Sequence, residues 1–185
     1  LVHADSAGTR DPRASSAHCE DFVFVKAGVT YSPDHKWITL LDQDGRATLF
    51  DAATLRRARW QLPADERFCA LDWSHDGTRI AGASTDGVVQ VWDVQGGDRL
   101  RVFPRRPEVV LSVAFHPHDR DVLLTASSDR AVRLWTLGTG EGSGPVQLLV
   151  LRGHKGAVGS AVFSPDARYV LSAADDGTAR LWTLT

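Results

Sequence analysis

One motif recurs four times along the chain: an aspartate, five further residues, and then a tryptophan or phenylalanine. The four copies are Asp44 to Phe50, Asp86 to Trp92, Asp129 to Trp135 and Asp176 to Trp182. Their aromatic residues follow one another at intervals of 42, 43 and 47 residues. The chain therefore repeats one structural unit, and a period of roughly 40 to 45 residues is typical of a unit of four β-strands.

Each copy has a second fixed point, an aromatic residue followed by a turn-forming cluster. The clusters are Tyr31-Ser32-Pro33-Asp34, Trp73-Ser74-His75-Asp76, Phe115-His116-Pro117-His118 and Phe163-Ser164-Pro165-Asp166. This aromatic residue lies 13 residues before the motif aspartate, or 14 residues in the third copy. Two fixed points at a constant separation indicate that all copies share one internal arrangement.

Short segments rich in β-branched and aromatic residues lie between the turns and predict strands. The second copy is expected to have four strands, at 69–74, 79–84, 88–93 and 99–103. The first three strands of the other copies are expected at 27–32, 37–42 and 46–51, at 111–116, 122–127 and 132–137, and at 159–164, 169–174 and 179–184. Asp-Gly joins the second strand to the third in three copies, because glycine accepts a positive φ without steric cost. Asp129-Arg130 predicts a turn of a different type in the third copy.

These patterns predict an all-β protein of about four propeller blades, each of four antiparallel strands. Residues 1–21 are polar and small, and we interpret them as a linker or loose arm before a propeller segment at 22–185. The expected blades are 22–62, 63–104, 105–152 and 153–185. The last of them lacks an outer strand, which predicts a partial or open propeller. Gly138 to Gly144 is expected to lengthen a loop of the third blade.

The residues resemble the tryptophan-aspartate repeat, or WD40, β-propeller family over about residues 25 to 185. The fourth copy carries the fullest signature: Gly153-His154, Phe163-Ser164-Pro165-Asp166, Ser172, Asp176 and Leu181-Trp182. The dipeptide that names the family occurs once, as Trp92-Asp93. The first copy departs most, because Phe50 replaces the tryptophan and no Gly-His precedes it. Four copies in register make the resemblance specific.

The resemblance implies that an interior network of His154, Ser172, Asp176 and Trp182 locks the fourth blade. Only this copy has the histidine, so the other blades are expected to depend on turns and packing alone. Their repeat anchors are Asp44, Phe50, Asp86, Trp92, Asp129 and Trp135. Serine, histidine and aspartate also suit a nucleophile, a base and an orienting group. A catalytic serine must be exposed, whereas Ser172 lies inside an apolar strand, so a structural network is favoured.

Other candidate sites give weaker signals. His116 and His118 suit a metal, but they occupy a turn position and no third ligand is fixed nearby, so turn decoration is favoured. The glycines from Gly138 to Gly144 are not followed by Lys-Ser or Lys-Thr, as a phosphate-binding loop requires. No metal and no cofactor are therefore expected.

Composition narrows the classes of partner and the compartment. A net charge of −2 disfavours a nucleic-acid-binding surface. No apolar run approaches the ~18 residues that a membrane helix needs. Cys19 and Cys69 are two cysteines without a disulfide framework, so a reducing, cytoplasmic location is expected. Neither nucleic acid nor membrane is predicted as a partner.

The resemblance implies a non-enzymatic scaffold or sensor module that binds a protein or peptide, within a larger multidomain signalling or regulatory protein. Such propellers place their contacts beside the turn between the second and third strands and near the start of the first strand. The matching positions are Gln43, Arg67, Thr85, Val109, Ser128, Ala157 and Asp175. Asp175 and Asp176 form a local acidic spot, which suggests a basic partner segment.

Alternatives stay open on activity and on blade number. An enzyme would have its site in the propeller channel, yet the first strands are apolar at Val29, Leu71, Val113 and Ala161. Four blades do not make the usual ring of about seven. Further blades in the same longer chain are expected to complete it; the alternatives are a second copy that builds an eight-bladed dimer and a strained four-bladed ring.

Overall fold

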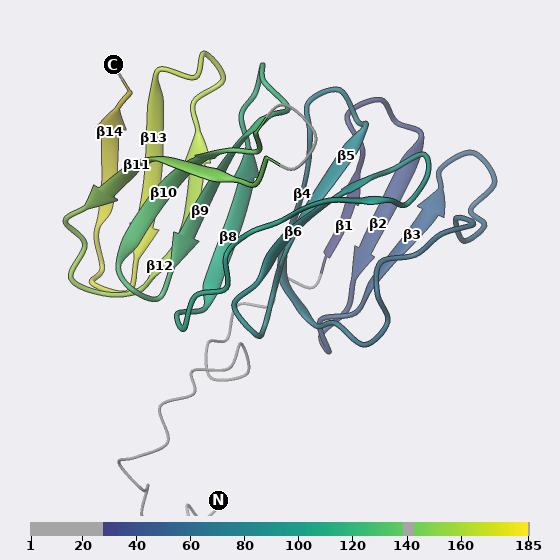
Figure 1. Ribbon diagram of the computed structural model, residues 1–185, viewed down its shortest axis with the longest axis horizontal. Coiled ribbons are helices and arrows are strands. Elements are labelled where there is room, and N and C mark those ends of the chain that lie inside the picture. Colours follow the sequence, from purple (N-terminus) through teal and green to yellow (C-terminus); the bar gives the residue numbers. More distant parts are fainter. Residues whose placement is uncertain (1–27, 139–142, 185) are drawn as a thin grey trace, which may run out of the picture.

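The computed structural model describes residues 28–138 and 143–184, and all regular structure in them is β-strand (Figure 1). Blade 1 contains β1 (Gly28–Tyr31), β2 (Trp37–Leu41) and β3 (Ala47–Asp51), and blade 2 contains β4 (Phe68–Trp73), β5 (Arg79–Ser84), β6 (Val89–Asp93) and β7 (Arg99–Val102). Blade 3 contains β8 (Val110–Phe115), β9 (Val122–Ser127), β10 (Ala131–Thr136) and β11 (Val146–Arg152), and blade 4 contains β12 (Val158–Phe163), β13 (Tyr169–Ala174) and β14 (Ala179–Thr183). Every strand expected from the sequence is present, and the ends differ by at most one residue. The expected arm at 1–21 lies outside the described residues.

Each blade is one antiparallel sheet whose strands follow chain order from the inside of the molecule to its rim. The four sheets stand side by side in an arc, with blade 1 at one end and blade 4 at the other (Figure 1). Blades 2 and 3 have four strands, and the described parts of blades 1 and 4 have three. The all-β fold and the open propeller of about four blades are thereby confirmed.

A side chain stands in for part of the missing fourth strand of blade 1. The amide of Gln61 donates from Nε2 to the Leu49 carbonyl at 2.9 Å and accepts the Leu49 N–H through Oε1 at 2.9 Å. These are the two bonds that a neighbouring strand would make with β3. Beside them, Ala58 N–H also donates to the Leu49 carbonyl. The backbone polar groups of β3 are thus satisfied without a regular outer strand.

The hydrophobic core is divided among the junctions between neighbouring blades. We call the side of a blade that packs on the next blade its forward face, and the opposite side its rear face. At the junction of blades 2 and 3, the forward face supplies Ala81, Ala83, Val89, Val91 and Phe103, and the rear face supplies Val110, Val113, Phe115, Leu123, Trp135 and Leu137. Equivalent clusters join blade 1 to blade 2 and blade 3 to blade 4. A single blade therefore has no complete core of its own.

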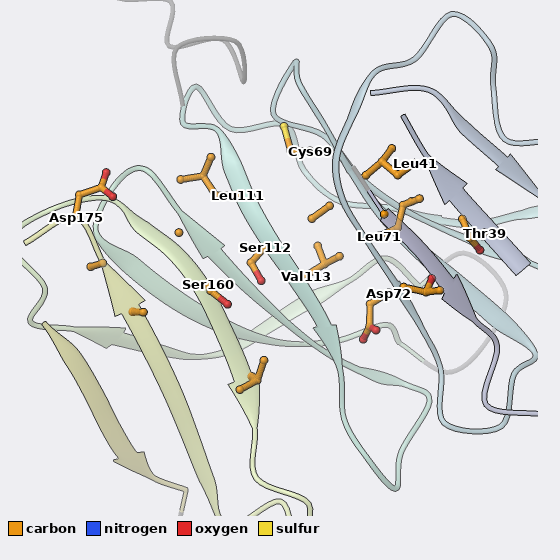
Figure 2. A pocket seen from close by; sticks show the side chains of 17 residues that line it. Thr39, Leu41, Cys69, Leu71, Asp72, Leu111, Ser112, Val113, Ser160 and Asp175 are labelled. Carbon is orange, nitrogen blue, oxygen red and sulfur yellow. The ribbon is translucent and has the colours of Figure 1, made fainter. Parts of the chain in front are cut away.

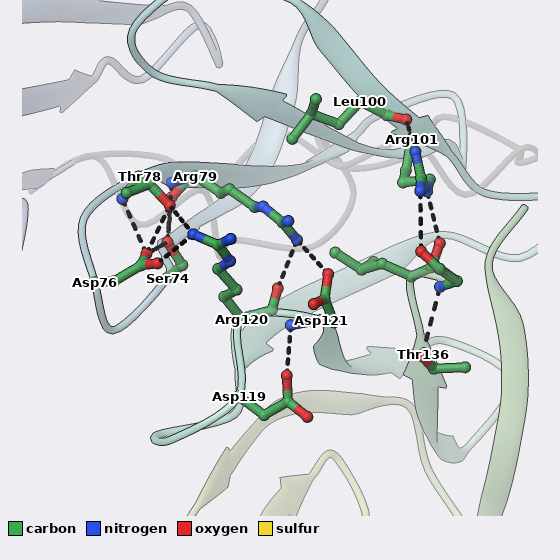
Figure 3. Close-up of polar contacts among 12 residues, drawn as sticks. Ser74, Asp76, Thr78, Arg79, Leu100, Arg101, Asp119, Arg120, Asp121 and Thr136 are labelled. Atoms are coloured by element: carbon green, nitrogen blue, oxygen red, sulfur yellow. Dashed lines mark hydrogen bonds and ion pairs between the residues drawn. The ribbon is translucent and has the colours of Figure 1, made fainter. Parts of the chain in front are cut away.

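Charged side chains reinforce the junction of blades 2 and 3 at the end of the sheets where the first and third strands finish (Figure 3). Arg79 of β5 forms an ion pair with Asp121 at 2.6 Å. Arg120 forms another with Asp76, which sits in the turn after β4, at 3.0 Å. Arg101 of β7 donates to the carbonyls of Leu137 and Gly138 beyond the end of β10. Inner and outer strands of the two blades are therefore held together.

The turn between the second and third strands has the same backbone conformation in every blade. Gly45, Gly87 and Gly177 have φ values of 76°, 81° and 74°. Arg130 has a φ of 70° and donates its N–H to the Ser127 carbonyl, as the glycines do to the equivalent carbonyls. The prediction of a different turn type in the third copy was wrong. Arg130 takes this left-handed conformation in the tight turn that joins the paired strands β9 and β10, although it is unfavourable for a residue with a Cβ.

Blades 1 and 4 do not meet. Val29 on the rear face of blade 1 is 60% exposed, and Leu181 on the forward face of blade 4 is 66% exposed. A four-bladed ring would bury both side chains against each other. The alternative of a strained four-bladed ring is therefore wrong for the described chain.

Candidate partner-binding face and the polar networks of the blades

The residues predicted to contact a partner come together in pairs at one end of each sheet. Three backbone bonds join the turn after the second strand to the residue just before the first strand: Thr85 to Arg67 at 2.6 Å, Ser128 to Val109 at 3.0 Å and Asp175 to Ala157 at 2.9 Å. Gln43 lies in the corresponding turn of blade 1, where it is exposed. Blades 2, 3 and 4 thus each present one small, backbone-anchored unit at this end, which we call the upper face.

The seven side chains are not equally accessible. Gln43 and Asp175 are exposed, and Arg67, Thr85, Ser128 and Ala157 are partly exposed. Val109 is buried in a small apolar cluster with Cys69 and Leu111, against which Ala157 packs. Val109 therefore supports the upper face from beneath, while its neighbours are open to solvent.

A cavity of about 740 Å³ opens among the inner strands (Figure 2). Its walls come from the first strands of all four blades, together with parts of β2 and β13. The wall carries two carboxylates, Asp72 and Asp175, and among the described residues that line it there is no lysine, arginine or histidine. The hydroxyls of Thr39, Ser112 and Ser160 add further polar groups, and the Thr39 Oγ1 atom is buried without a hydrogen-bond partner among the described residues.

Asp72 links two blades from inside this cavity. Its Oδ2 atom accepts the backbone N–H of Phe115, on the first strand of blade 3, at 2.7 Å. Burial raises the pKa of Asp72 from 3.8 to about 6, although the N–H groups of Phe115 and Trp73 act in the opposite direction. No motif of the sequence marks Asp72 by itself. Alignment of the copies marks it, because Ala114 and Val162 occupy its place in the later blades.

The predicted network of blade 4 is present. His154 Nε2 lies 2.8 Å from Ser172 Oγ, and Trp182 Nε1–H donates to the same oxygen at 2.8 Å. His154 Nδ1 lies 3.1 Å from Asp176 Oδ2. Asp176 also accepts from the Thr178 hydroxyl at 2.6 Å and from the Lys155 N–H at 2.7 Å. The four predicted residues therefore form one continuous chain of hydrogen bonds.

The environment of these residues suits a structural lock. The Thr178 hydroxyl and the Lys155 N–H hold the pKa of Asp176 well below its usual range, against a smaller effect of desolvation. Ser172 is 1% exposed, and its oxygen is already engaged by both the histidine and the indole. A nucleophilic serine needs an open approach for the substrate and nearby oxyanion donors. The geometry of this serine therefore favours the structural interpretation.

Blade 3 has a polar network of different composition. Trp135 Nε1–H donates to Thr125 Oγ1 at 2.9 Å, as Trp182 does to Ser172. Arg106 stands four residues before the first strand, where His154 stands in blade 4, and its guanidinium lies 5.5 Å from the Trp135 ring centre. Asp129 forms a bidentate ion pair with Arg133. Burial acts to raise the pKa of Asp129, but the hydrogen bond and the charge of Arg133 lower it. The expectation that the other blades depend on turns and packing alone was wrong for blade 3, because Trp135 and Asp129 have side-chain partners in Thr125 and Arg133.

In blade 2 an aromatic pair occupies the place of the polar network. Gly82 stands where Ser172 stands in blade 4, and a Cβ added to it would lie 2.8 Å from the Phe68 ring. Phe68 fills this space and packs edge to face on Trp92, with ring centres 5.7 Å apart. Ser84 still donates to Asp86, so that the anchor Asp86 stabilises its own turn. In blade 1, Asp44 is exposed and lies 4.0 Å from Arg46.

His116 and His118 have the role expected of turn residues. His118 N–H donates to His116 Nδ1 at 3.2 Å, and the His116 ring packs edge-on against Phe163 of blade 4 with centres 5.0 Å apart. Burial lowers the pKa of His116, with His118 and His75 acting in the same direction and Asp119 opposing. The described residues contain no cluster of three or more histidine, cysteine, aspartate or glutamate side chains arranged to hold a metal ion.

The pattern of blades, turn anchors and buried tryptophans can be compared with known families. The family described as WD domain, G-beta repeat matches residues 61–93, 97–136 and 145–183, which is more than half of the chain. The chain belongs to the WD-repeat family. Each of the last two matched segments begins in the outer strand of one blade and ends in the third strand of the next, so that every such WD repeat links two blades. The three strands of blade 1 lie outside the matched segments, in agreement with its divergent sequence.

Relatives of this WD-repeat chain occur in distant organisms. It is 29% identical over 166 residues to an uncharacterized WD repeat-containing protein of Synechocystis, and the aligned region covers 90% of the chain and 46% of that relative. It is 34% identical over 198 residues to coronin-7 of Mus musculus, covering 98% of the chain and 20% of coronin-7. A WD repeat-containing protein 26 homolog of Arabidopsis thaliana is 26% identical over 161 residues. The chain thus spans less than half the length of these relatives.

Two further observations bear on the environment of the chain. In its described part, no helix has the length and apolar character that crossing a bilayer requires. Cys69 is disulfide-bonded, which corrects the expectation of a free thiol at this position. The other cysteine of the chain, Cys19, lies outside the described residues.

Proposed function

We propose that this WD-repeat chain is a non-enzymatic platform that binds a protein or peptide on its upper face, as part of a larger signalling or regulatory protein. One observation carries the proposal: three turn and strand-start pairs with the same backbone bond lie at one end of the blades whose first strands line a cavity, and Asp175 of one pair is itself part of the cavity wall. WD repeats generally mediate interactions between proteins, which agrees with such a surface. A rigid array of short polar turns suits the recognition of an extended segment.

The charge of the cavity supports a basic partner segment. Asp175 is exposed at the rim, Asp72 lies deeper, and no basic side chain is among the described lining residues. A lysine or arginine of the partner would therefore meet carboxylates without a competing cation. Electrostatic complementarity of this kind mainly affects the association rate and the choice of partner. The proposed ligand is thus a basic segment of a protein or peptide.

Charge reversal tests the proposal. Fluorescence anisotropy would measure the binding of labelled peptides from a lysine- and arginine-rich library, with an acidic library beside it. We expect Asp175→Lys to weaken the binding of selected basic peptides at least tenfold. The matched control is Asp98→Lys, because Asp98 is equally exposed but lies in the turn between β6 and β7, at the opposite end of the sheet. Equal affinities of the wild-type chain and the Asp175 variant would refute the assignment.

The cytoplasmic location expected from the sequence stays a prediction, although the disulfide at Cys69 argues against it. The redox state of Cys69 tests it. Alkylation of the chain in its native compartment, followed by mass spectrometry, would count its free thiols. Two alkylated cysteines would support the cytoplasm. A chain without any alkylated cysteine would support an oxidising compartment and overturn the cytoplasmic location, since disulfides persist mainly in oxidising compartments.

A further inference from the structure

The forward face of blade 4 is an exposed surface of a kind that is buried everywhere else in the described chain. Leu171 is 47% exposed, whereas Leu124 holds the same place in blade 3 and is 1% exposed. Leu181 is likewise exposed, and its counterpart in blade 2, Val91, is completely buried. Both positions of blade 4 carry leucine although no described residue covers them. Exposed apolar surface of this kind marks a site of association.

The rear face of blade 1 shows the matching feature at the other end of the arc. Tyr31 is 58% exposed, whereas Phe115, in the same place on blade 3, is buried in the junction with blade 2. Val29 is also exposed, and its counterpart Val113 is buried in the same cluster. Figure 1 places the two open faces at opposite ends of the row of sheets.

These two faces are the two halves of a junction that the chain already forms three times. In each formed junction a forward face packs on the rear face of the following blade. The forward face of blade 4 lacks a rear face, and the rear face of blade 1 lacks a forward face. A second copy of the chain carries a face of each kind, so it can cover both open faces of the described residues.

We propose that the forward face of blade 4 docks on the rear face of blade 1 of a second copy of this chain. The reciprocal contact between the same two copies then covers the remaining pair of faces. Two arcs of four blades make a ring of eight, which lies within the range of ~4 to 8 blades that propellers adopt. A head-to-tail contact that closes in this way stops at two copies, whereas one that does not close produces a filament.

The mass of the 185-residue chain in solution tests the proposal. Light scattering behind a sizing column should give twice the 20.2 kDa of one chain, independent of concentration above the dissociation constant. Leu181→Arg and Val29→Arg should each reduce the mass to that of one chain. The control is Leu148→Arg, because Leu148 is 55% exposed on the outer strand β11 and belongs to neither face. Far-UV circular dichroism would verify that each variant is folded.

Mixing the two face variants distinguishes this contact from others. The Val29→Arg chain keeps its forward face and the Leu181→Arg chain keeps its rear face, so an equimolar mixture should recover the mass of two chains through one intact junction. A wild-type chain that remains at 20.2 kDa up to its solubility limit would overturn the proposal. A mass that grows with concentration beyond two copies would also overturn it. A dimer that survives Val29→Arg and is lost only with Leu181→Arg would overturn it too, because it indicates that blade 4 pairs with itself.

Discussion

The indole N–H of Trp135 donates to Thr125 Oγ1 at 2.9 Å in the buried interior of blade 3. The bond satisfies a polar group that a large apolar ring would otherwise carry unpaired into the core. Thr125→Val keeps the shape and removes the acceptor. We expect it to lower the free energy of unfolding by about 1 to 3 kcal/mol, since a buried donor loses its partner. Urea denaturation followed by tryptophan fluorescence measures this, with Thr183→Val on the exposed part of β14 as the control.

Ser172 is the central member of the blade 4 network, because its oxygen contacts both His154 and Trp182. Ser172→Ala should lower the free energy of unfolding by about 1 to 3 kcal/mol. Ser172→Thr should retain most of the stability, as threonine performs this role in blade 3. If alanine and threonine reduced the midpoint of urea unfolding equally, the hydroxyl would not be the stabilising group.

Arg130 occupies a left-handed turn position that glycine occupies in the other blades. Arg130→Gly should raise the free energy of unfolding by about 1 kcal/mol, because it removes the clash of a Cβ in this conformation. The converse substitution, Gly177→Ala, should lower it by about 1 kcal/mol; no described atom lies within 4 Å of the new Cβ, so only the backbone is strained. Thermal unfolding would show opposite shifts, and shifts of the same sign would contradict this account.

The pH dependence of stability should reveal Asp72. Its pKa is about 6 in the folded chain and near 3.8 when unfolded, so the folded state binds the proton more tightly. The contribution of this group to the free energy of unfolding therefore falls as the pH rises from about 4 to about 6, by on the order of 2 to 3 kcal/mol. Asp72→Asn should remove this loss, because the asparagine Oδ1 still accepts the Phe115 N–H.

Urea titrations at several pH values would compare the two proteins. The variant should equal the wild-type chain near pH 4 and exceed it above pH 6. Asp76 and Asp176 act in the other direction: their pKa values are lowered, so the stability that they contribute is lost as the pH falls below about 4. They are present in both proteins and cancel in the comparison. A difference between the proteins that does not vary with pH would show that Asp72 does not titrate in this range.

Much of the fold follows from local sequence. The alternation of β-branched and aromatic residues located every strand except β11 to within one residue at each end, and the Asp-Gly pairs located three of the turns. The quartet of blade 4 was also predictable, because its members occupy fixed positions in the repeat. The blade 3 network was not. Arg106 stands where His154 stands and lies over Trp135, but the bonds of this network come from Thr125 and Arg133, which no signature residue marks in the sequence.

The sequence by itself determined the unit that is copied, its strands and its anchors, since these depend on side-chain alternation and turn geometry within a few dozen residues. Tertiary structure decided which apolar side chains are buried. Leu124 and Leu171 hold the same place in successive blades, yet only Leu124 has another blade packed on it. The physical reason is that the core of this fold forms between sheets, so burial depends on the neighbouring blade and not on the strand that carries the residue.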